Sequence, residues 1–356
     1  MANTSLNLQR NSEVYVSTVD LVAGGAATDM TNVNTWRVEV LAGYSASQAA
    51  ATQDITSMES GLTPDRSTQR FNTSMNPTEW NFQTYLRPTV ALNTGVTAYN
   101  GNAMPVADWF MWQALMSNTA FASGVGVASV LQSTFQNAGS FALTERAAAA
   151  NVRAHTSNFA VASQHQIYIK MDNVYYQIQN ATVNEGSIDA AIDGIATTTW
   201  TGFGTDFVEL QGAALTAIKT VIDTPANGYA NVAPATGKYH KWGVVNNGTV
   251  DVAASFIKNR LSTINVTHQV AGLGSANTYT FPVTGLGFTY NNALTYITPE
   301  ELSVMNTPIG QFTGARMITG NFTAYLRTGD ANSAQFLRNL VNESRTSTAA
   351  AATANL

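Results

Sequence analysis

Apolar and polar residues alternate with a period of two in several short segments, and β-branched or aromatic residues occupy most of the apolar positions. The segments are 13–19, 36–40, 166–170 and 175–178. Successive side chains of a strand point to opposite faces, so this period predicts strands that bury one face. Residues 171–174 fit a short turn, and links of hairpin length join antiparallel strands only. The pattern therefore predicts antiparallel sheets and a hairpin over 166–179.

A longer alternating run covers residues 188–203. Gly194 inside this run fits a bulge, because a glycine within a strand commonly marks one. We expect the run to form one further strand after the strands at 166–170 and 174–181.

Helical spacing is rarer than strand spacing. Residues 105–117 and 333–343 each carry apolar side chains at positions i, i+1, i+4 and i+5, which predicts a helix with one narrow apolar stripe. The stripe residues are Phe110, Met111, Ala114 and Leu115 in the first helix and Phe336, Leu337, Leu340 and Val341 in the second. Pro105 suits the first turn of its helix, and Asp330 or Ser333 suits the cap of the other.

Two further segments have a helical pattern. They are the alanine-rich residues 146–154 and residues 213–223, which end before Pro225. Residues 224–250 are rich in Gly, Asn, Pro and Ala and read as an inserted loop. The Ser/Thr/Ala tail has few large apolar residues, so we expect it to be mobile.

The chain contains an internal repeat. Residues 81–87 (NFQTYLR) return 240 positions later as residues 321–327 (NFTAYLR), with identity at five of seven positions. Upstream, residues 40–45 have a counterpart in 284–289, and downstream each copy leads into a predicted helix. A solenoid repeat spans only about 20–50 residues, so we predict instead a duplicated unit of strand, long hairpin, strand and helix.

The duplication predicts that residues 36–117 and 279–342 superpose, with Tyr85 and Tyr325 at equivalent places. The corresponding domains are a first unit at 1–212, an insertion or linker at 213–254, a second unit at 255–343 and a flexible tail at 344–356. Three predicted strands follow the first helix and none follows the second, so the second unit is incomplete. An uncovered sheet edge invites pairing. We expect either that the chain is a fragment of a longer product or that a neighbouring subunit completes the sheet.

Charged residues make up 11% of the chain, against roughly 25% in a typical globular protein. The hydrophobic content of 45% is sufficient for two cores. A surface with so few charges is poorly protected against association, so we expect copies of the same chain to cover much of it.

Seventeen basic and 22 acidic residues give a formal net charge of −5, without a cluster of Lys or Arg. High affinity for a nucleic-acid backbone is therefore excluded, because such binding rests on clustered basic residues. The absence of cysteine excludes disulfides, thiolate metal sites and thiol nucleophiles. Residues 1–5 do not begin a signal peptide, and no apolar run approaches 18 residues, so we expect a soluble protein without a membrane partner.

The sequence does not contain a convincing catalytic, cofactor or metal site. The spacing of His155, His165, His240 and His268 does not suggest a metal centre. Residues 43–47 (GYSAS) are similar to a nucleophile elbow but lack its final glycine and fit a hairpin better. We therefore expect neither catalytic residues nor cofactors, and an enzyme is the least favoured reading.

Paired carboxylates have simpler explanations than acid–base catalysis. Thr298-Pro299-Glu300-Glu301-Leu302 reads as a cap, a first-turn proline and acidic residues at a helix N-terminus, where the helix dipole favours negative charge. Asp189 and Asp193 fall on one face of a strand if the alternation is unbroken, which suits solvent or a lumen.

The repeated stretches also resemble a known family. The similarity lies in residues 38–48, 52–61, 190–204, 291–302 and 306–310. These segments resemble the strands and hairpins of bacteriophage tail tube proteins. The resemblance implies a mainly β fold with minor α, made of tandem antiparallel β-sandwich or barrel units, each with a flanking helix. It further implies assembly into stacked rings around a channel for DNA.

From this resemblance we expect a structural virion protein of the phage tail, assembled in the host cytoplasm, that forms the conduit for genome ejection. Its expected partners are itself, the tape measure protein, and other tail proteins such as the terminator, the baseplate or tip, and a sheath. DNA would pass through the lumen without specific binding. Rings of three chains are expected if both units are complete, and rings of six if only the first lines the channel. The alternative is a virion decoration or receptor-binding module.

The two long hairpins, 43–60 and 287–302, are expected to contact the adjacent ring. The candidate contact residues are Tyr44, Gln53, Asp54 and Glu59 in the first hairpin and Phe288, Tyr296, Glu300 and Glu301 in the second. Asp189 and Asp193 are the candidate lumen-facing residues, because negative charge there lets DNA slide.

Overall fold

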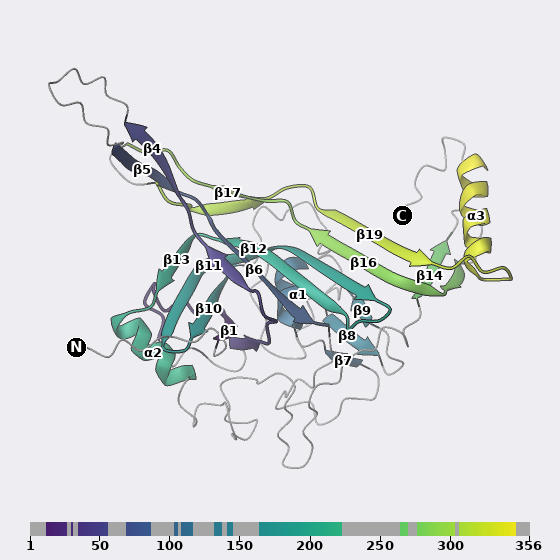
Figure 1. Cartoon of the computed structure of the whole chain (residues 1–356), viewed down its shortest axis with the longest axis horizontal. Coiled ribbons are helices and arrows are strands. Elements are labelled where there is room, and N and C mark those ends of the chain that lie inside the picture. The colour runs from purple at the N-terminus through teal and green to yellow at the C-terminus, as the bar shows by residue number, and fades with distance from the viewer. Residues whose placement is uncertain are drawn as a thin grey trace, which may run out of the picture.

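The structure is a computed structural model that describes residues 12–26, 30, 35–55, 69–86, 103–105, 108–116, 132–136, 141–144, 164–222, 264–269, 276–302 and 306–346. It is mainly β, as predicted, and antiparallel strands dominate it (Figure 1). Ten strands form one large sheet that bends into two parts, which we call sheet A and sheet B. The predictions for 146–154, 224–250 and the tail beyond 346 lie outside the described residues, as does Glu59.

Sheet A contains five strand segments in the order β2, β1, β10, β11, β13. Their bounds are β1 Ser12–Ser17, β2 Thr35–Val38, β10 His165–Met171, β11 Val174–Ala191 and β13 Asp206–Glu209. The predicted hairpin over 166–179 is confirmed as β10 and β11, and Asp172 in its turn has a φ of 57°.

Sheet B contains six strand segments in the order β3, β6, β12, β11, β16, β19. The bounds of the strands not yet given are β3 Ser45–Ser47, β6 Thr78–Tyr85, β12 Thr197–Gly204, β16 Val283–Asn291 and β19 Met317–Ala324. The 18-residue strand β11 belongs to both sheets: residues 174–179 and Ala181 pair in sheet A, and residues 182–191 pair in sheet B. Asn180, at the corner between them, has a φ of 46°.

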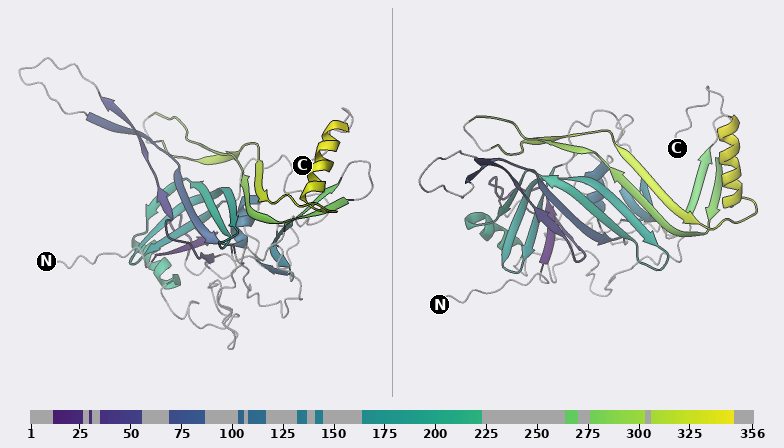
Figure 2. Two further views of the ribbon diagram at one scale, coloured as in Figure 1. Left: turned by 45° about the vertical axis from the view of Figure 1, so that its right-hand side comes forward. Right: turned by 45° about the horizontal axis from the view of Figure 1, so that its top comes forward.

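Two paired hairpins project from the sheet, and Figures 1 and 2 show that they extend toward the same end of the molecule. The first arm consists of β4 Ala50–Ile55 and β5 Gln69–Met75, and the second arm of β17 Leu294–Ile297 and β18 Gly310–Thr313. Smaller sheets pair β14 Ile264–Gln269 with β15 Ala276–Phe281, and β8 Gln132–Gln136 with β7 Ala103–Pro105 and β9 Phe141–Thr144.

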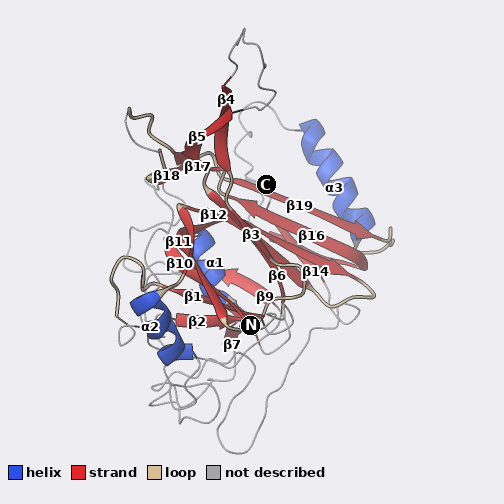
Figure 3. Cartoon of the chain, turned by 60° about the vertical axis from the view of Figure 1, so that its left-hand side comes forward, coloured by secondary structure: helices blue, strands red, loops and turns tan. Residues whose placement is uncertain are grey.

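Three helices accompany the strands in the described part of the chain: α1 Trp109–Met116, α2 Gly212–Ile222 and α3 Ser333–Thr346 (Figure 3). The helices predicted at 213–223 and 333–343 are therefore confirmed. The first helix begins later than predicted, because Pro105 lies in β7 opposite Thr134 and not in a helical turn.

Two more predictions are wrong. The run 188–203 is not one strand with a bulge at Gly194: β11 ends at Ala191, and the chain turns before β12 begins at Thr197. Residues 192–196 form this turn and continue the alternating pattern, so the pattern does not reveal the turn. Residues 298–302 do not begin a helix in the described chain, since they form the loop that follows β17.

Two buried clusters hold the first unit together. The larger one gathers side chains from both sheets around α1, so sheets A and B form the two layers of a sandwich. Trp112 of α1 and Trp200 of β12 lie at its centre with ring centroids 4.7 Å apart. The smaller cluster lies on the other face of sheet A, where Ile218 and Ile222 of α2 pack against Tyr168 and Tyr175. Residues 213–222, which the sequence assigns to the insertion, therefore pack on the first unit.

The same order of elements occurs twice along the described chain. In the first unit, β1 and β2 form a pair, β3 pairs with β6, the first arm lies between these two strands, and α1 follows. In the second, β14 and β15 form a pair, β16 pairs with β19 around the second arm, and α3 follows. The second set has no equivalents of β10, β11 and β12 in the described part of the chain.

Candidate assembly interfaces

Sheet B has one apolar face and one polar face, because alternate residues of each strand point to opposite sides. In β6 the even-numbered residues from Thr78 to Thr84 are buried, while Glu79, Asn81 and Gln83 are exposed. The register carries this division from β6 to β19. One apolar row runs Phe82, Trp200, Gly186, Tyr290, Ile318.

The polar face continues from the first unit into the second. Three rows cross it: Ser45, Asn81, Thr201, Glu185, Asn291, which ends at the exposed Met317 of β19; then Gln83, Thr199, Ser187, Thr289, Thr319; then Tyr85, Thr197, Asp189, Gly287, Asn321. Cross-strand hydrogen bonds fix these side chains. Gln83 donates to Thr199 (3.0 Å), Ser187 and Thr289 share a bond (2.9 Å), and Asn291 donates to Glu185 (2.7 Å).

This polar face carries little charge, and the charge it carries is negative. Along the described sheet B strands its charged residues are Glu79, Glu185 and Asp189, and these positions include neither Lys nor Arg. A phosphate backbone passing over the face would meet hydroxyl and amide groups rather than fixed cations. Asp189 lies on this polar face, and Asp193 lies on the exposed turn beyond β11. That these two residues face a lumen stays a prediction.

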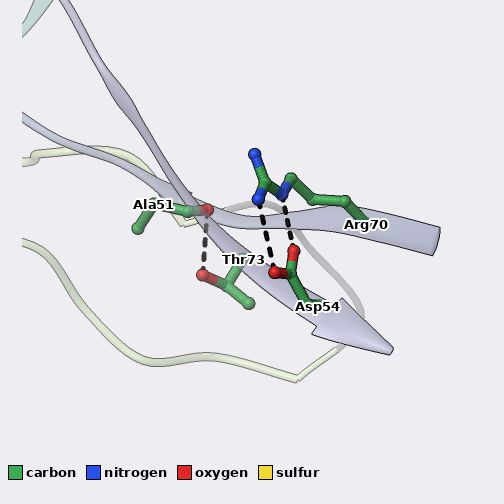
Figure 4. A network of polar contacts seen from close by, with 4 residues as sticks. All are labelled: Ala51, Asp54, Arg70 and Thr73. Atoms are coloured by element: carbon green, nitrogen blue, oxygen red, sulfur yellow. Dashed lines mark hydrogen bonds and ion pairs between the residues drawn. The ribbon is translucent and has the colours of Figure 1, made fainter. Parts of the chain in front are cut away.

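The first arm carries Gln53 and Asp54 as exposed residues. Figure 4 shows Asp54 paired with Arg70 on the adjacent strand, with 2.6 Å from Arg70 Nε to Asp54 Oδ1. The hydrogen bond from Arg70 lowers the pKa of the Asp54 carboxyl. Nearby, Thr73 donates to the carbonyl oxygen of Ala51 (3.1 Å).

Three of the candidate contact residues are turned inward. Tyr44 and Phe288 are partly buried against the large core cluster. The hydroxyl of Tyr296 donates to the carbonyl oxygen of Asn180 (3.1 Å) and shares a second bond with Thr182 (3.1 Å), so it holds the second arm to β11. Burial raises the pKa of Tyr296 to about 12. Glu300 and Glu301, by contrast, are exposed beyond the end of β17.

The two arms are also tied to each other. Asn306, in the second arm, forms a parallel bridge with Ser74, and its carbonyl oxygen accepts a bond from the amide of Met75 (2.8 Å). The Asn306 side chain accepts a bond from the amide of Glu301 (3.0 Å), which fixes the loop. The backbone bonds at Asn306 therefore join the first arm to the second.

The second unit leaves apolar surface open where the first unit buries it. Phe82 of β6 is 4% exposed, whereas Phe322 of β19 is 45% exposed. Met111, Trp112 and Leu115 of α1 are buried, but three apolar side chains of α3 are exposed, namely Leu337, Leu340 and Val341. β19 has one described partner, β16, so no described strand pairs with its other edge.

The described residues do not contain other recognisable chemistry. Among them no group of three or more His, Asp or Glu side chains is positioned to hold a metal ion. The described helices are too short or too polar to cross a bilayer.

The structure brings together two sets of residues that are not predicted from the sequence. One is the set of Thr, Ser, Asn and Gln residues on the polar face, for which the period-two pattern of small polar residues in 197–201 was an available signal. The other is the exposed apolar set on the second arm, which includes Leu302, Ile309 and Phe312. No pattern in the sequence separates these from core residues.

Comparison with known proteins adds an independent observation. No family model matches the chain. The tail tube protein pb6 of Escherichia phage T5 is 29% identical over 345 residues, which cover 95% of this chain and 61% of pb6. The chain is similar in sequence to a phage tail tube protein. The predicted resemblance is thereby confirmed, and the chain spans less than two thirds of the length of pb6.

Two solved chains of an extracellular contractile injection system also align. They come from the extended state of the PVC sheath/tube terminator and of the PVC sheath–tube complex. Their identities are 9% and 10%, each alignment covers 59% of this chain, and the coverage of the other chains is 100% and 95%. Both TM-scores are 0.28, too low for a conclusion about this chain.

Proposed function

We propose that this chain is a structural subunit of a phage tail tube. The observation that carries the proposal is sheet B, whose polar face lacks basic residues along its described strands and crosses from one unit into the other. Similarity to pb6 over most of the chain supports the same assignment. The proposed role is structural rather than enzymatic. The subunit would assemble in the host cytoplasm and reside in the virion tail.

The proposed mechanism follows from two features of sheet B, namely the edge of β19 and the polar face. A neighbouring segment pairs with β19 and extends sheet B around a closed ring, which removes the exposed edge. The polar face then becomes the wall of the lumen, where Glu79, Glu185 and Asp189 repel phosphates weakly and the absence of cations avoids binding that ejection would have to break. The apolar face, with α1 and α3, is turned outward from the lumen.

The proposed partners are copies of the chain first, then the tape measure protein inside the tube and the terminator, baseplate or tip, and sheath around or beyond it. DNA passes through without specific contacts. If both related units line the channel, we propose rings of three chains with pseudo-sixfold symmetry. If only the first unit lines the channel, we propose rings of six chains. The domain division into units at 1–212 and 255–343 is part of the same proposal, with the helix that ends at Ile222 packed on the first unit.

Negative-stain microscopy of the purified protein tests this function. Hollow tubes or discrete rings with a central channel are the expected result. Monomers or compact trimers at high concentration, with a well-folded chain by circular dichroism, would contradict it and would favour a decoration or receptor-binding module.

A further inference from the structure

Each arm is anchored by one side chain that bonds to the first unit near the corner of β11. The two arms lie side by side and are joined at Asn306 (Figure 3). Gln48 anchors the first arm, and Tyr296 anchors the second. These two residues are far apart in the chain, yet their hydrogen bonds lead to the same pair of residues, Thr205 and Asn180.

Gln48 lies between β3 and β4, at the base of the first arm. Its side-chain amide donates to the carbonyl oxygens of Asn76 (3.0 Å) and Thr205 (3.1 Å), and its side-chain oxygen accepts a bond from the amide of Phe207 (3.1 Å). Asn76 directly follows β5, so these bonds close the base of the arm. They also tie the arm to the link between β12 and β13, where Thr205 lies.

Thr205 is buried and carries the connection to the corner. Its amide and its hydroxyl both donate to the carbonyl oxygen of Gln179, at 2.9 and 3.2 Å. The same hydroxyl accepts a bond from the side chain of Asn180 (3.1 Å), and the carbonyl oxygen of Asn180 accepts one from Tyr296. Hydrogen bonds therefore lead without interruption from Gln48 through Thr205 and Asn180 to Tyr296, and we call them the corner bonds.

Asn180 suits this position for two reasons. Its φ of 46° lies in a region that asparagine tolerates better than most residues. Its side chain also supplies the donor to Thr205, which a glycine at the same φ would lack. The amide of Asn180 donates to Gln166, so the residue is held from sheet A as well. Polar networks of this kind are rigid when their members are satisfied, and each bond supports the next.

We propose that the corner bonds couple the two arms, so that loosening one arm loosens the other. The coupling runs through the bend in β11 and not through the contact between the arms at Asn306. Because a coupling free energy is reciprocal, a partner that orders one arm also orders the other without touching it. This device goes beyond the proposed tube function and does not depend on it, since all of the bonds lie within one chain.

Hydrogen exchange of the isolated chain tests the coupling, with β10 as the internal reference because it lies between β1 and β11. Gln48→Ala removes the anchor of the first arm. We expect it to raise the exchange rates of the protected amides of β17, in the second arm, by at least about fivefold while β10 is unchanged. Tyr296→Phe is the reciprocal variant and should raise the exchange rates of β4 and β5 by a similar factor.

Two further variants separate the corner from other routes. Thr73→Val removes the bond from Thr73 to the Ala51 carbonyl oxygen, which lies within the first arm and outside the corner bonds. It should raise exchange in β4 and β5 and leave β17 within about twofold of the unmodified chain. Asn180→Gly keeps the positive φ but removes the bond to Thr205, so it should raise exchange in both arms at once.

Three outcomes overturn the coupling. The first is unchanged exchange of the unsubstituted arm in either Gln48→Ala or Tyr296→Phe. The second is an effect of Thr73→Val on β17 equal to that of Gln48→Ala, because the contact at Asn306 would then carry the coupling. The third is a rise in β10 equal to the rise in the arms, which would indicate a global loss of stability. Each measurement uses the isolated chain, so each leaves the proposed tube function to its own test by microscopy.

Discussion

The hydroxyl of Tyr296 donates a 3.1 Å hydrogen bond to the carbonyl oxygen of Asn180, at the corner where β11 passes from sheet A to sheet B. Asn180 adopts a φ of 46°, a conformation that asparagine tolerates better than most residues. Its amide donates to Gln166 and its side chain to Thr205, both at 3.1 Å. The corner of the first unit is thus also the anchor of the second arm, so the position of the arm depends on the bend in β11.

Replacing Tyr296 with phenylalanine should therefore weaken this anchor. The substitution leaves the Asn180 carbonyl oxygen without the tyrosine donor, and we expect a loss of about 1 kcal/mol in the free energy of unfolding. Urea unfolding of the variant and the unmodified chain provides the measurement. An unchanged midpoint would show that the hydroxyl is not part of the anchor.

The same tyrosine predicts a specific dependence on alkaline pH. Burial raises the pKa of Tyr296 from 10.0 to about 12. The folded chain then retains a proton that the unfolded chain releases, so this contribution is fully present below pH 10 and is lost as pH rises toward about 12. Tyr296→Phe should flatten this part of the profile, and Tyr168, whose pKa burial also raises, should account for some of the remaining fall. An identical alkaline profile in the variant would contradict the account.

Gly202 and Gly285 should respond very differently to alanine. A Cβ at Gly202 would overlap the carbonyl oxygen of Thr182 and the indole ring of Trp80, whereas a Cβ at Gly285 would meet nothing within 4 Å. We expect Gly202→Ala to cost about 3 kcal/mol of folding free energy and Gly285→Ala to change it by less than about 0.5 kcal/mol. Chemical denaturation of both variants tests this, and similar costs would contradict the described packing of β12 against β6.

The two phenylalanines of the repeat should also differ. Phe82 is buried and its truncation to alanine should cost about 3–5 kcal/mol in any state of the protein. Phe322 is 45% exposed in the isolated chain, so Phe322→Ala should cost below about 1 kcal/mol there. If assembly covers the open second unit, the same substitution should raise the protein concentration needed to form rings. Equal losses in the isolated chain would mean that the second core is already closed.

Local pattern was enough to predict much of the fold. The alternation in 13–19 and 166–179 predicts β1, β10 and the first part of β11, and the pattern of residues 213–223 predicts α2. The short strand β13 is not predicted. The turn before β12 was missed because Ile192 and Asp193 continue the alternating pattern through it. The antiparallel pairing of β11 with β12 determines where the chain turns. A pattern of neighbouring residues does not contain information about that pairing.

The candidate interface was predicted less completely. Asp54, Glu300 and Asp189 are exposed as the sequence suggested, but Tyr44 and Tyr296 pack inward. Aromatic residues near the base of a hairpin can point either to a partner or to the core, and the sequence does not distinguish these directions. The exposed apolar residues of the second arm were missed for the same reason.

Hydrogen exchange of β19, measured in isolated chains and in assembled protein with β6 as the internal reference, tests the central claim most directly. β6 lies between β3 and β12, so its amides should be protected in both states. No described strand pairs with the other edge of β19, so we expect its outward-facing amides to become protected only on assembly. Equal protection of residues 317–324 in the two states would contradict the claim that a neighbouring segment completes sheet B.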